Sequence, residues 1–534
     1  MGKTVFSVAV ISFLARFASL AATQVYMSFY GSAALNIYSY AITVIQVIFT
    51  CAGTALTTVV VPAYSSLLGQ GSGTGASGGT GASGGQRADK FLNDIITISS
   101  AFIVVLILLA FALTPVLIGV SGAGTSGGAG PSGGNIRANA EEFNYTVFCL
   151  RVSLPVMFFN GLNFIFQGVL QSHGKFALPA AVSLPSSLSI ILYVALLGGR
   201  FGVTGLLYAT LAGLALQAVF LLPAVLKTGY RYKFSFDLKS PEIVFCLKAS
   251  GPALAAVSAY QVNTLFNTSL VLGLGQTAIY NFVNNIFITS ILTFVYSVTA
   301  VYYPKFSTAW AAGDMDGYRN SLGQVINVLL LFLIPAMFGF GLTRFQIFNL
   351  LSRWGKITRE DIAVAGNLLG LYALGIVPLA LKEVFDRAFY AQRNTKISAA
   401  AGFIIMAANI AVGLSLINTL GVLAMPVAYT ISAALGVIAL AAVMYKKTGG
   451  FLKRAGVAVL KYLTAALVMS AIILTVEHLL GGKFGDGLAG RLADFAIPVA
   501  AGVPVYFAAA LALGVKEVRE TAARLRTWKR TLRR

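Results

Sequence analysis

The residue with the clearest chemical role in this sequence is Arg16, which lies near the middle of a long apolar run at residues 4–29. A charged side chain at the centre of a bilayer costs roughly 2.5 to 3.5 kcal/mol even on lenient insertion scales. Such a side chain therefore usually faces a wet cavity, a counter-ion or a substrate. Arg16 predicts a transport path through the protein.

Amides are the commonest polar side chains in the other apolar runs. Candidate substrate-binding residues, together with Arg16, are Gln24, Arg151, Gln261, Asn263, Asn267, Asn281, Asn284 and Asn285. The last three are spaced i, i+3 and i+4, which places them on one face of a helix. That face has the donors and acceptors to bind a glycan or peptide, but amides also join helices to one another in membranes. The sequence leaves both interpretations open.

A second group of charges, Lys382, Glu383, Asp386 and Arg387, lies in the run at residues 361–391. Its i, i+4 spacing predicts the pairs Lys382 with Asp386 and Glu383 with Arg387. The alternative is a proton relay. Because we find no other deep acid in the runs, the sequence gives little support to strict proton coupling through a carboxylate.

The sequence gives no support for catalysis or for a bound cofactor. The phosphate-binding pattern G-x-x-x-x-G-K-[ST] is absent, and no polar segment is long enough to form a catalytic domain. The chain has two histidines and three cysteines without the spacing of metal ligands. We therefore predict a protein that is not an enzyme and holds no metal or cofactor.

The composition identifies the environment of these residues. Of the 534 residues, 57% are hydrophobic and 10% are charged, which is typical of an all-α, polytopic membrane protein. We predict fourteen transmembrane helices, each long enough to cross roughly 30 Å of hydrocarbon. Their approximate ranges are 4–29, 34–66, 91–120, 144–171, 175–198, 201–226, 242–273, 275–303, 318–343, 361–391, 396–418, 420–445, 455–480 and 490–515.

The distribution of Lys and Arg predicts the orientation in the membrane. Basic residues concentrate in alternate loops, so the positive-inside rule places both termini in the cytoplasm. The tail at residues 516–534 is basic and is expected to lie on anionic membrane lipids. A nucleic-acid partner is not expected, since the tail lacks the interleaved aromatic residues that single strands stack on.

Two similar segments suggest an internal repeat. Val61-Pro62-Ala63-Tyr64 ends the second predicted span, and Tyr303-Pro304-Lys305-Phe306 ends the eighth. An even number of intervening spans relates the two copies by an axis along the membrane normal, and such parallel repeats place a substrate between two lobes. The alternative is that proline and serine simply end many membrane helices.

The repeat predicts two six-helix lobes in a pseudo-twofold arrangement, followed by two C-terminal helices. The expected N-lobe is 1–226, the C-lobe 227–446, the appended helices 447–515 and the tail 516–534. The Gly/Ser-rich stretches at 69–86 and 121–135 are expected to be loops without chemistry.

Several short motifs, taken in order, resemble the MurJ lipid II flippases of the multidrug/oligosaccharidyl-lipid/polysaccharide exporter superfamily. The resemblance covers about residues 4–446. The matching stretches are Gly53-Thr54-Ala55-Leu56-Thr57-Thr58, Gly251-Pro252, Gln261-Val262-Asn263, Ala311-Ala312-Gly313-Asp314, Arg387-Ala388-Phe389-Tyr390-Ala391 and Asn394-Thr395-Lys396.

This resemblance implies a bacterial cytoplasmic-membrane protein that moves lipid II outwards by alternating access. It implies a cationic cavity between the lobes for the diphosphate and sugars, and a groove at the last two helices for the polyprenyl tail. Lipid II, or a related polyprenyl-diphosphate glycan, is then the expected partner, with a monomer sufficient for transport.

The charges that the resemblance implies are only partly present. Arg16 matches the first arginine of the family's first span, whereas the second falls on an uncharged position. An arginine expected in the second span falls near Ile42 or Thr43, and an Asp-Arg pair falls on Asn284 and Asn285. The acid often found in the seventh span is Asn267. The expected cavity is therefore less charged than in the family pattern.

Three alternatives remain open at this stage. The protein could export another polyprenyl-linked glycan, act as a drug/cation antiporter of the same superfamily, or be a scaffold that kept the fold and lost transport. An antiporter should carry deep acids that hold protons or Na⁺. The missing arginines are the best argument for a scaffold.

Overall fold

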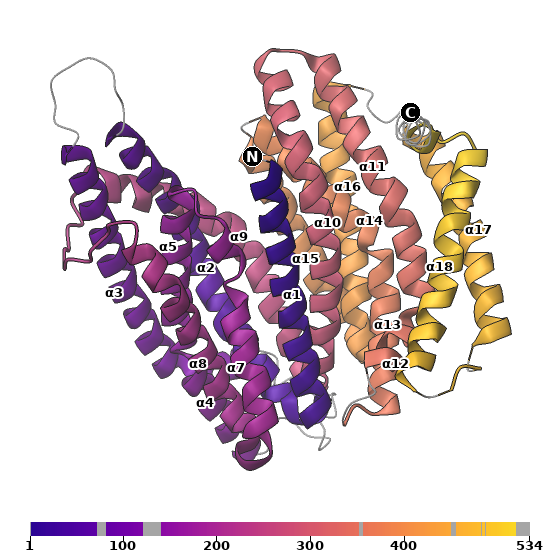
Figure 1. The fold of residues 1–534 in the computed structure, drawn as a ribbon, viewed down its shortest axis with the longest axis horizontal. Coiled ribbons are helices and arrows are strands. Elements are labelled where there is room, and N and C mark those ends of the chain that lie inside the picture. The colour runs from indigo at the N-terminus through magenta and orange to yellow at the C-terminus, as the bar shows by residue number, and fades with distance from the viewer. Residues whose placement is uncertain are drawn as a thin grey trace, which may run out of the picture. The chain divides into compact units, whose positions relative to one another are not determined.

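The computed structural model describes residues 2–71, 82–120, 140–351, 356–392, 394–449, 455–481, 483–485 and 487–519. Every regular element in these ranges is helical (Figure 1). The predicted loop at 121–135 and most of the basic tail lie outside the described residues. The other Gly/Ser-rich stretch, residues 69–86, lies between two helices. The first ends at Gly71 and the second begins at Ala82, so only residues 72–81 lie outside the described residues.

Contacts divide the chain into two compact units. The first, unit 1, comprises residues 1–278 with 354–356. Its helices are α1 (Gly2–Tyr30), α2 (Ser32–Gly71), α3 (Ala82–Val120), α4 (Ala140–Ser153), α5 (Val156–Ser172), α6 (Ala177–Ala180), α7 (Ser183–Leu196), α8 (Gly198–Leu226) and α9 (Pro241–Gly273).

Unit 2 comprises residues 279–353 and 357–534. Its helices are α10 (Thr277–Ala311), α11 (Met315–Leu342), α12 (Arg344–Leu351), α13 (Arg359–Leu374), α14 (Ile376–Ala391), α15 (Thr395–Leu420), the 3₁₀ turn η1 (Gly421–Leu423), α16 (Ala424–Thr448), α17 (Ala455–Leu480) and α18 (Leu488–Ala512).

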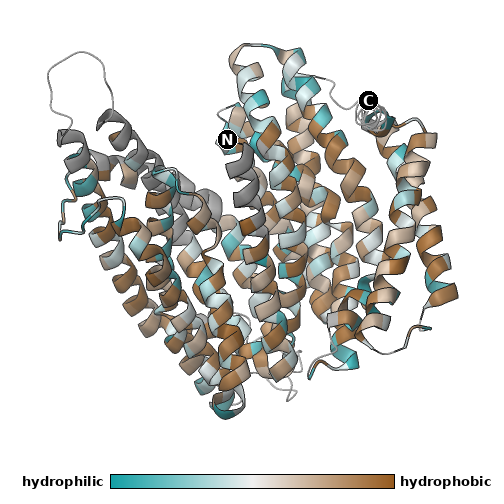
Figure 2. Cartoon of the chain, in the orientation of Figure 1, coloured by the Kyte–Doolittle hydropathy of each residue, from teal (hydrophilic) through white to brown (hydrophobic). Residues whose placement is uncertain are grey.

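The helices are apolar enough for a membrane. Ten stretches of the described chain are long and apolar enough to cross a bilayer, or eleven when the bent pair α13 and α14 counts as one span. Apolar residues run along the middle of most helices, and hydrophilic residues are concentrated toward helix ends (Figure 2). The expected helical membrane class is therefore confirmed.

Several predicted spans are broken where proline or glycine interrupts the helix. The span at 144–171 ends at Ser153 and resumes at Val156, around Pro155, which lacks the backbone N–H that continues a helix. The span at 361–391 bends by 46° between α13 and α14, at Gly375. The short helix α12 was missed, because its eight residues are too few for a span.

Contacts group residues 227–278 with the helices of unit 1. Helix α9 packs along α2, more extensively than any other pair of described helices, so unit 1 extends to Ala278. The expected boundaries rest on the repeat and stay a prediction.

Polar side chains fasten the helices within unit 1. The amide of Asn163 in α5 donates to Gln217 Oε1 of α8 at 3.1 Å, and Gln217 Nε2 donates to Ser186 Oγ of α7 at 2.6 Å. In a bilayer such bonds contribute on the order of 0.6 kcal/mol each. The amides of Asn163 and Gln217 therefore join helices to one another.

Asn36 of α2 fixes the turn between α9 and α10. Its Oδ1 accepts from the backbone N–H of Ala278 at 2.9 Å, and its Nδ2 donates to the carbonyl of Gly275. Gly275 has a φ of +66°, a conformation that glycine adopts without strain. The side chain of Asn36 thus supplies an N-cap to α10 from a different helix.

We expect Asn36→Ala to destabilise the protein by about 1 to 2 kcal/mol, because a buried N-cap bond and its partner are lost together. The apparent melting temperature in detergent should fall by about 1 to 2 °C. Asn36→Asp keeps the acceptor for Ala278 but sets a buried carboxylate beside the Gly275 carbonyl, so it should destabilise at least as much. An unchanged melting temperature for the alanine variant would show that the turn does not depend on this side chain.

Candidate functional site

Arg16 lies on the face of α1 that unit 1 leaves uncovered. The preceding residue, Ala15, is buried, and its carbonyl accepts from Ser183 Oγ of α7 at 3.1 Å. Arg16 is exposed, with the exposed side chains of Leu14 and Phe17 beside it. In the part of the chain that the structure describes, no hydrogen bond or ion pair engages its guanidinium. A guanidinium is thus held on an apolar helix and is open to an anionic ligand.

Gln24 lies two turns further along α1 and is half-buried. Its Nε2 donates to Ser28 Oγ one turn later, at 2.9 Å. Residues 16 and 24 differ by eight positions, or about 80° around a helix with 3.6 residues per turn. The two side chains therefore lie on neighbouring faces.

Arg151 packs against a neighbouring helix. Its guanidinium carbon lies 4.3 Å from the centroid of the Phe111 ring of α3, a cation–π distance. Its Nε is buried and finds no hydrogen-bond acceptor among the described residues. The contact explains how α3 and α4 tolerate this charge. A role for Arg151 in substrate binding stays a prediction.

The amides of α9 lie on the helix that packs along α2. Asn263 and Asn267 are 9% and 5% exposed, while Gln261 is half-buried. The Oδ1 atoms of Asn263 and Asn267 are buried and accept no hydrogen bond from the described part of the chain. Buried amide oxygens are normally paired. These two therefore have unused acceptor capacity one helical turn apart.

The amides of α10 belong to unit 2. Residues 281–285 are helical, so Asn281, Asn284 and Asn285 share a helix face as the spacing predicts. Asn281 and Asn284 are half-buried and Asn285 is exposed. Asn285 Oδ1 accepts from Thr289 Oγ1 at 2.9 Å. Of the nine candidate residues, these three thus lie in unit 2 and the other six in unit 1.

The charges of α14 form a partly buried cluster in unit 2, in which Asp386 is the buried member. Lys382 Nζ lies 2.7 Å from Asp386 Oδ2 and 3.7 Å from Glu383 Oε1, which confirms the expected pair of Lys382 with Asp386. Arg387 instead lies over the ring of Tyr296 of α10, 5.0 Å from its centroid. Sequence spacing could not reveal this contact, because Tyr296 is far away along the chain.

One buried acid was missed in the sequence. Asp94 of α3 is 1% exposed, and its Oδ1 is without a partner among the described residues. It lies near the start of the span that begins at Arg87, next to the buried Asn93. The available signal was its place inside the predicted span at 91–120, after Phe91 and Leu92 and before Ile95 and Ile96. Within the described ranges, no group of three His, Cys, Asp or Glu side chains is placed to hold a metal ion.

Comparison with known proteins agrees with this architecture. Residues 27–489 match the model of the family described as lipid II flippase MurJ. A probable lipid II flippase MurJ of Rickettsia prowazekii is 24% identical over 395 residues, 73% of each chain.

Solved structures show the same fold. A lipid II flippase MurJ in an inward closed conformation has a TM-score of 0.74, with 21% identity over 96% of this chain and 99% of that one. An inward-facing multidrug resistance MATE family transporter of the MOP superfamily has a TM-score of 0.67, with 15% identity over 84% of this chain and 99% of that one. Because the family model matches well over half of this chain, the chain belongs to the lipid II flippase MurJ family.

Proposed function

We propose that this protein flips lipid II, the lipid-linked peptidoglycan precursor, from the inner to the outer leaflet of the bacterial cytoplasmic membrane by alternating access. The observation that carries the proposal is Arg16, a fixed cation that is exposed on an apolar helix of a chain in this family. A diphosphate is the substrate group that such a cation recognises best, through charge-assisted hydrogen bonds.

The proposed arrangement has fourteen spans, with both termini in the cytoplasm. The helices support this number when α4 joins α5, α6 joins α7 and α13 joins α14, and when the short α12 is left out. The first twelve spans form the two six-helix lobes of the repeat. Helices α17 and α18 follow them and pack on each other and on α11 and α12. We assign them the groove for the polyprenyl tail.

In the proposed site Arg16 binds the diphosphate and the amides bind sugar or peptide. Asn263 and Asn267 contribute the unused acceptors of their buried Oδ1 atoms. Gln24, Gln261 and the three asparagines of α10 add further donors and acceptors, and Arg151 adds a second cation. Transport needs no cofactor and no second subunit. The basic tail rests on anionic lipids of the cytoplasmic leaflet.

The test is depletion of the native protein in its own bacterium. Lipid II should then accumulate in the inner leaflet, and the wild-type chain should restore its export and cell growth. If another polyprenyl-linked glycan accumulates instead, that glycan is the substrate. If no lipid-linked precursor accumulates, the flippase proposal fails.

One observation favours a second candidate, a cation-coupled antiporter. The buried carboxylate of Asp94 is an acid of the kind that such transporters use to hold a proton or Na⁺. Proton-driven efflux of cationic drugs by the wild-type protein, abolished by Asp94→Asn, would support that function. Lipid II export that persists in Asp94→Asn would exclude an essential role of this acid in the flippase.

A further inference from the structure

The segment between α8 and α9, residues 227–240, has an unusual alternating sequence. Aromatic or apolar residues occupy the even positions from Tyr230 to Leu238, and Arg231, Lys233 and Lys239 occupy odd ones. In an extended chain, successive side chains point to opposite sides. The alternation therefore predicts an apolar side and a basic side for the segment. We call residues 230–239 the linker.

The linker is held firmly against α3. The hydroxyl of Tyr230 donates to Asn93 Oδ1 at 2.6 Å, and the backbone N–H of Lys233 donates to the same oxygen at 3.1 Å. Further along, Lys90 Nζ pairs with Asp237 Oδ2 at 3.0 Å. The hydrogen bond from Lys90 lowers the pKa of Asp237. Asp237 therefore remains ionised at neutral pH, and this tie is lost only as the pH falls through the lowered pKa.

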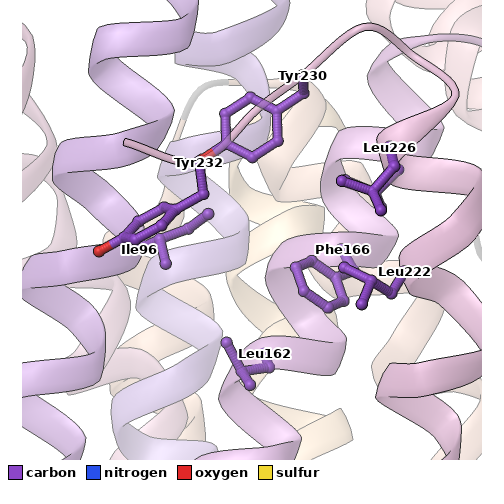
Figure 3. Close-up of a pocket in the computed structure, with 8 residues that line it drawn as sticks. Ile96, Leu162, Phe166, Leu222, Leu226, Tyr230 and Tyr232 are labelled. Atoms are coloured by element: carbon purple, nitrogen blue, oxygen red, sulfur yellow. The ribbon is translucent and has the colours of Figure 1, made fainter. Parts of the chain in front are cut away.

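An apolar pocket lies beneath the first part of the linker. It encloses about 130 Å³, and its lining includes Ile96 of α3, Phe166 of α5 and Leu222 of α8, with Tyr230 and Tyr232 of the linker (Figure 3). The hydroxyl of Tyr232 points away from Phe166 and Leu222, and it is 2.9 Å from Thr97 Oγ1. The lining of this partly open pocket is thus almost entirely carbon, which suits an apolar occupant.

Beyond the pocket, the apolar side of the linker is uncovered. Phe234, Phe236 and Leu238 are 80%, 54% and 45% exposed. Full burial of a Phe or Leu side chain is worth roughly 1.5 to 3 kcal/mol, and these partly exposed side chains forgo a share of that free energy. The segment is short and bonded to α3 near both ends, so it cannot fold back over these side chains. We therefore expect a partner outside the chain to cover them.

The position of the linker identifies what covers it. It follows directly after α8, whose last turn exposes Leu222 and Leu226 and is apolar enough to face hydrocarbon. Tyr230 and Tyr232 of the linker line one pocket with Leu222 and Leu226, and Phe234 and Phe236, which follow them in the chain, are exposed. The basic side chains carry the opposite charge to anionic lipid headgroups. A membrane surface matches both sides of the linker.

We propose that the linker docks into the surface of the cytoplasmic leaflet, with Phe234, Phe236 and Leu238 inserted below the headgroups and Arg231 and Lys233 bound to anionic lipids. Lipid chains fill the adjoining pocket. This docking fixes the start of α9 relative to the bilayer. It is independent of the substrate that the protein carries.

The test is lipid quenching of a single tryptophan in the full chain. Phe234→Trp is introduced after Trp310, Trp354 and Trp528 are replaced by phenylalanine, and the protein is reconstituted with brominated lipids. We expect at least twofold stronger quenching of this tryptophan than of the matched control Ser235→Trp. The quenching should increase when phosphatidylglycerol is added to phosphatidylcholine, and Arg231→Ser with Lys233→Ser should remove the increase.

A second measurement covers the case in which the tryptophan-free chain does not fold. The cysteine of Phe234→Cys should react with a polar maleimide in detergent and be at least tenfold slower in permeabilised proteoliposomes. The native Cys149 and Cys246 are buried, and the chain without the substitution gives the background rate. Equal reactivity in both media, or a Phe234→Trp fluorescence quenched by iodide and not by brominated lipid, would place the linker in water and overturn the proposal.

Discussion

Arg16→Ala is expected to lower lipid II translocation by roughly 10- to 100-fold, because a charge-assisted hydrogen bond to a diphosphate is worth about 1.5 to 3 kcal/mol. The side chain is exposed and has no partner in the described part of the chain, so its removal should leave the apparent melting temperature unchanged. Arg16→Lys should keep part of the activity, since a lysine retains the charge and loses the bidentate geometry.

The measurement is rescue of the depleted strain, followed by a leaflet assay of lipid II. A matched control is Arg200→Ala, because Arg200 is also exposed and lies beside an aromatic ring, 5.4 Å from the centroid of Phe201. That variant should transport normally. Full rescue by Arg16→Ala would remove the role that we propose for Arg16, while the depletion phenotype itself would still test the flippase function.

The largest effect on stability is expected at the α14 cluster. Lys382→Met should destabilise the protein by about 3 to 5 kcal/mol, because it leaves the carboxylate of Asp386 buried without its charge partner. The side chain of Asp386 is only 9% exposed and lies 2.7 Å from Lys382 Nζ. The apparent melting temperature in detergent should fall by roughly 3 to 5 °C.

A double variant separates the loss of a partner from the loss of a lysine. Lys382→Met combined with Asp386→Leu should recover most of the stability, since replacing a buried ion pair by apolar residues is often neutral. Lys305→Met is the surface control: Lys305 is exposed and lies 4.8 Å from the centroid of the Tyr302 ring, so its loss should be small. If the double variant is as unstable as the single one, the cluster does more than neutralise charge.

The helical membrane class could be predicted from the sequence because it depends on composition and run length. Spans such as 201–226 and 455–480 lie within a few residues of α8 and α17. Breaks inside spans could not be placed in the same way. Pro155 interrupts its span, whereas Pro304 lies inside the continuous α10, and the difference depends on whether neighbouring groups satisfy the freed backbone.

The candidate site was predictable in part. Local spacing placed Asn281, Asn284 and Asn285 on one face and paired Lys382 with Asp386, because both follow from the geometry of a single helix. The spacing of residues in the sequence carries no comparable signal for contacts between different helices. The stacking of Arg151 on Phe111 and of Arg387 on Tyr296 joins residues that are distant along the chain.

The sequence by itself determined that this is a helical membrane protein, that Arg16 is a cation within an apolar helix, and that its motifs resemble one family of lipid transporters. Tertiary structure decided which face of α1 Arg16 occupies, which amides are already bonded, and that α9 packs with α2. The physical reason is the distance along the chain over which each property acts. Hydropathy and helical periodicity act over a few turns, whereas burial and hydrogen-bond satisfaction depend on which helices become neighbours.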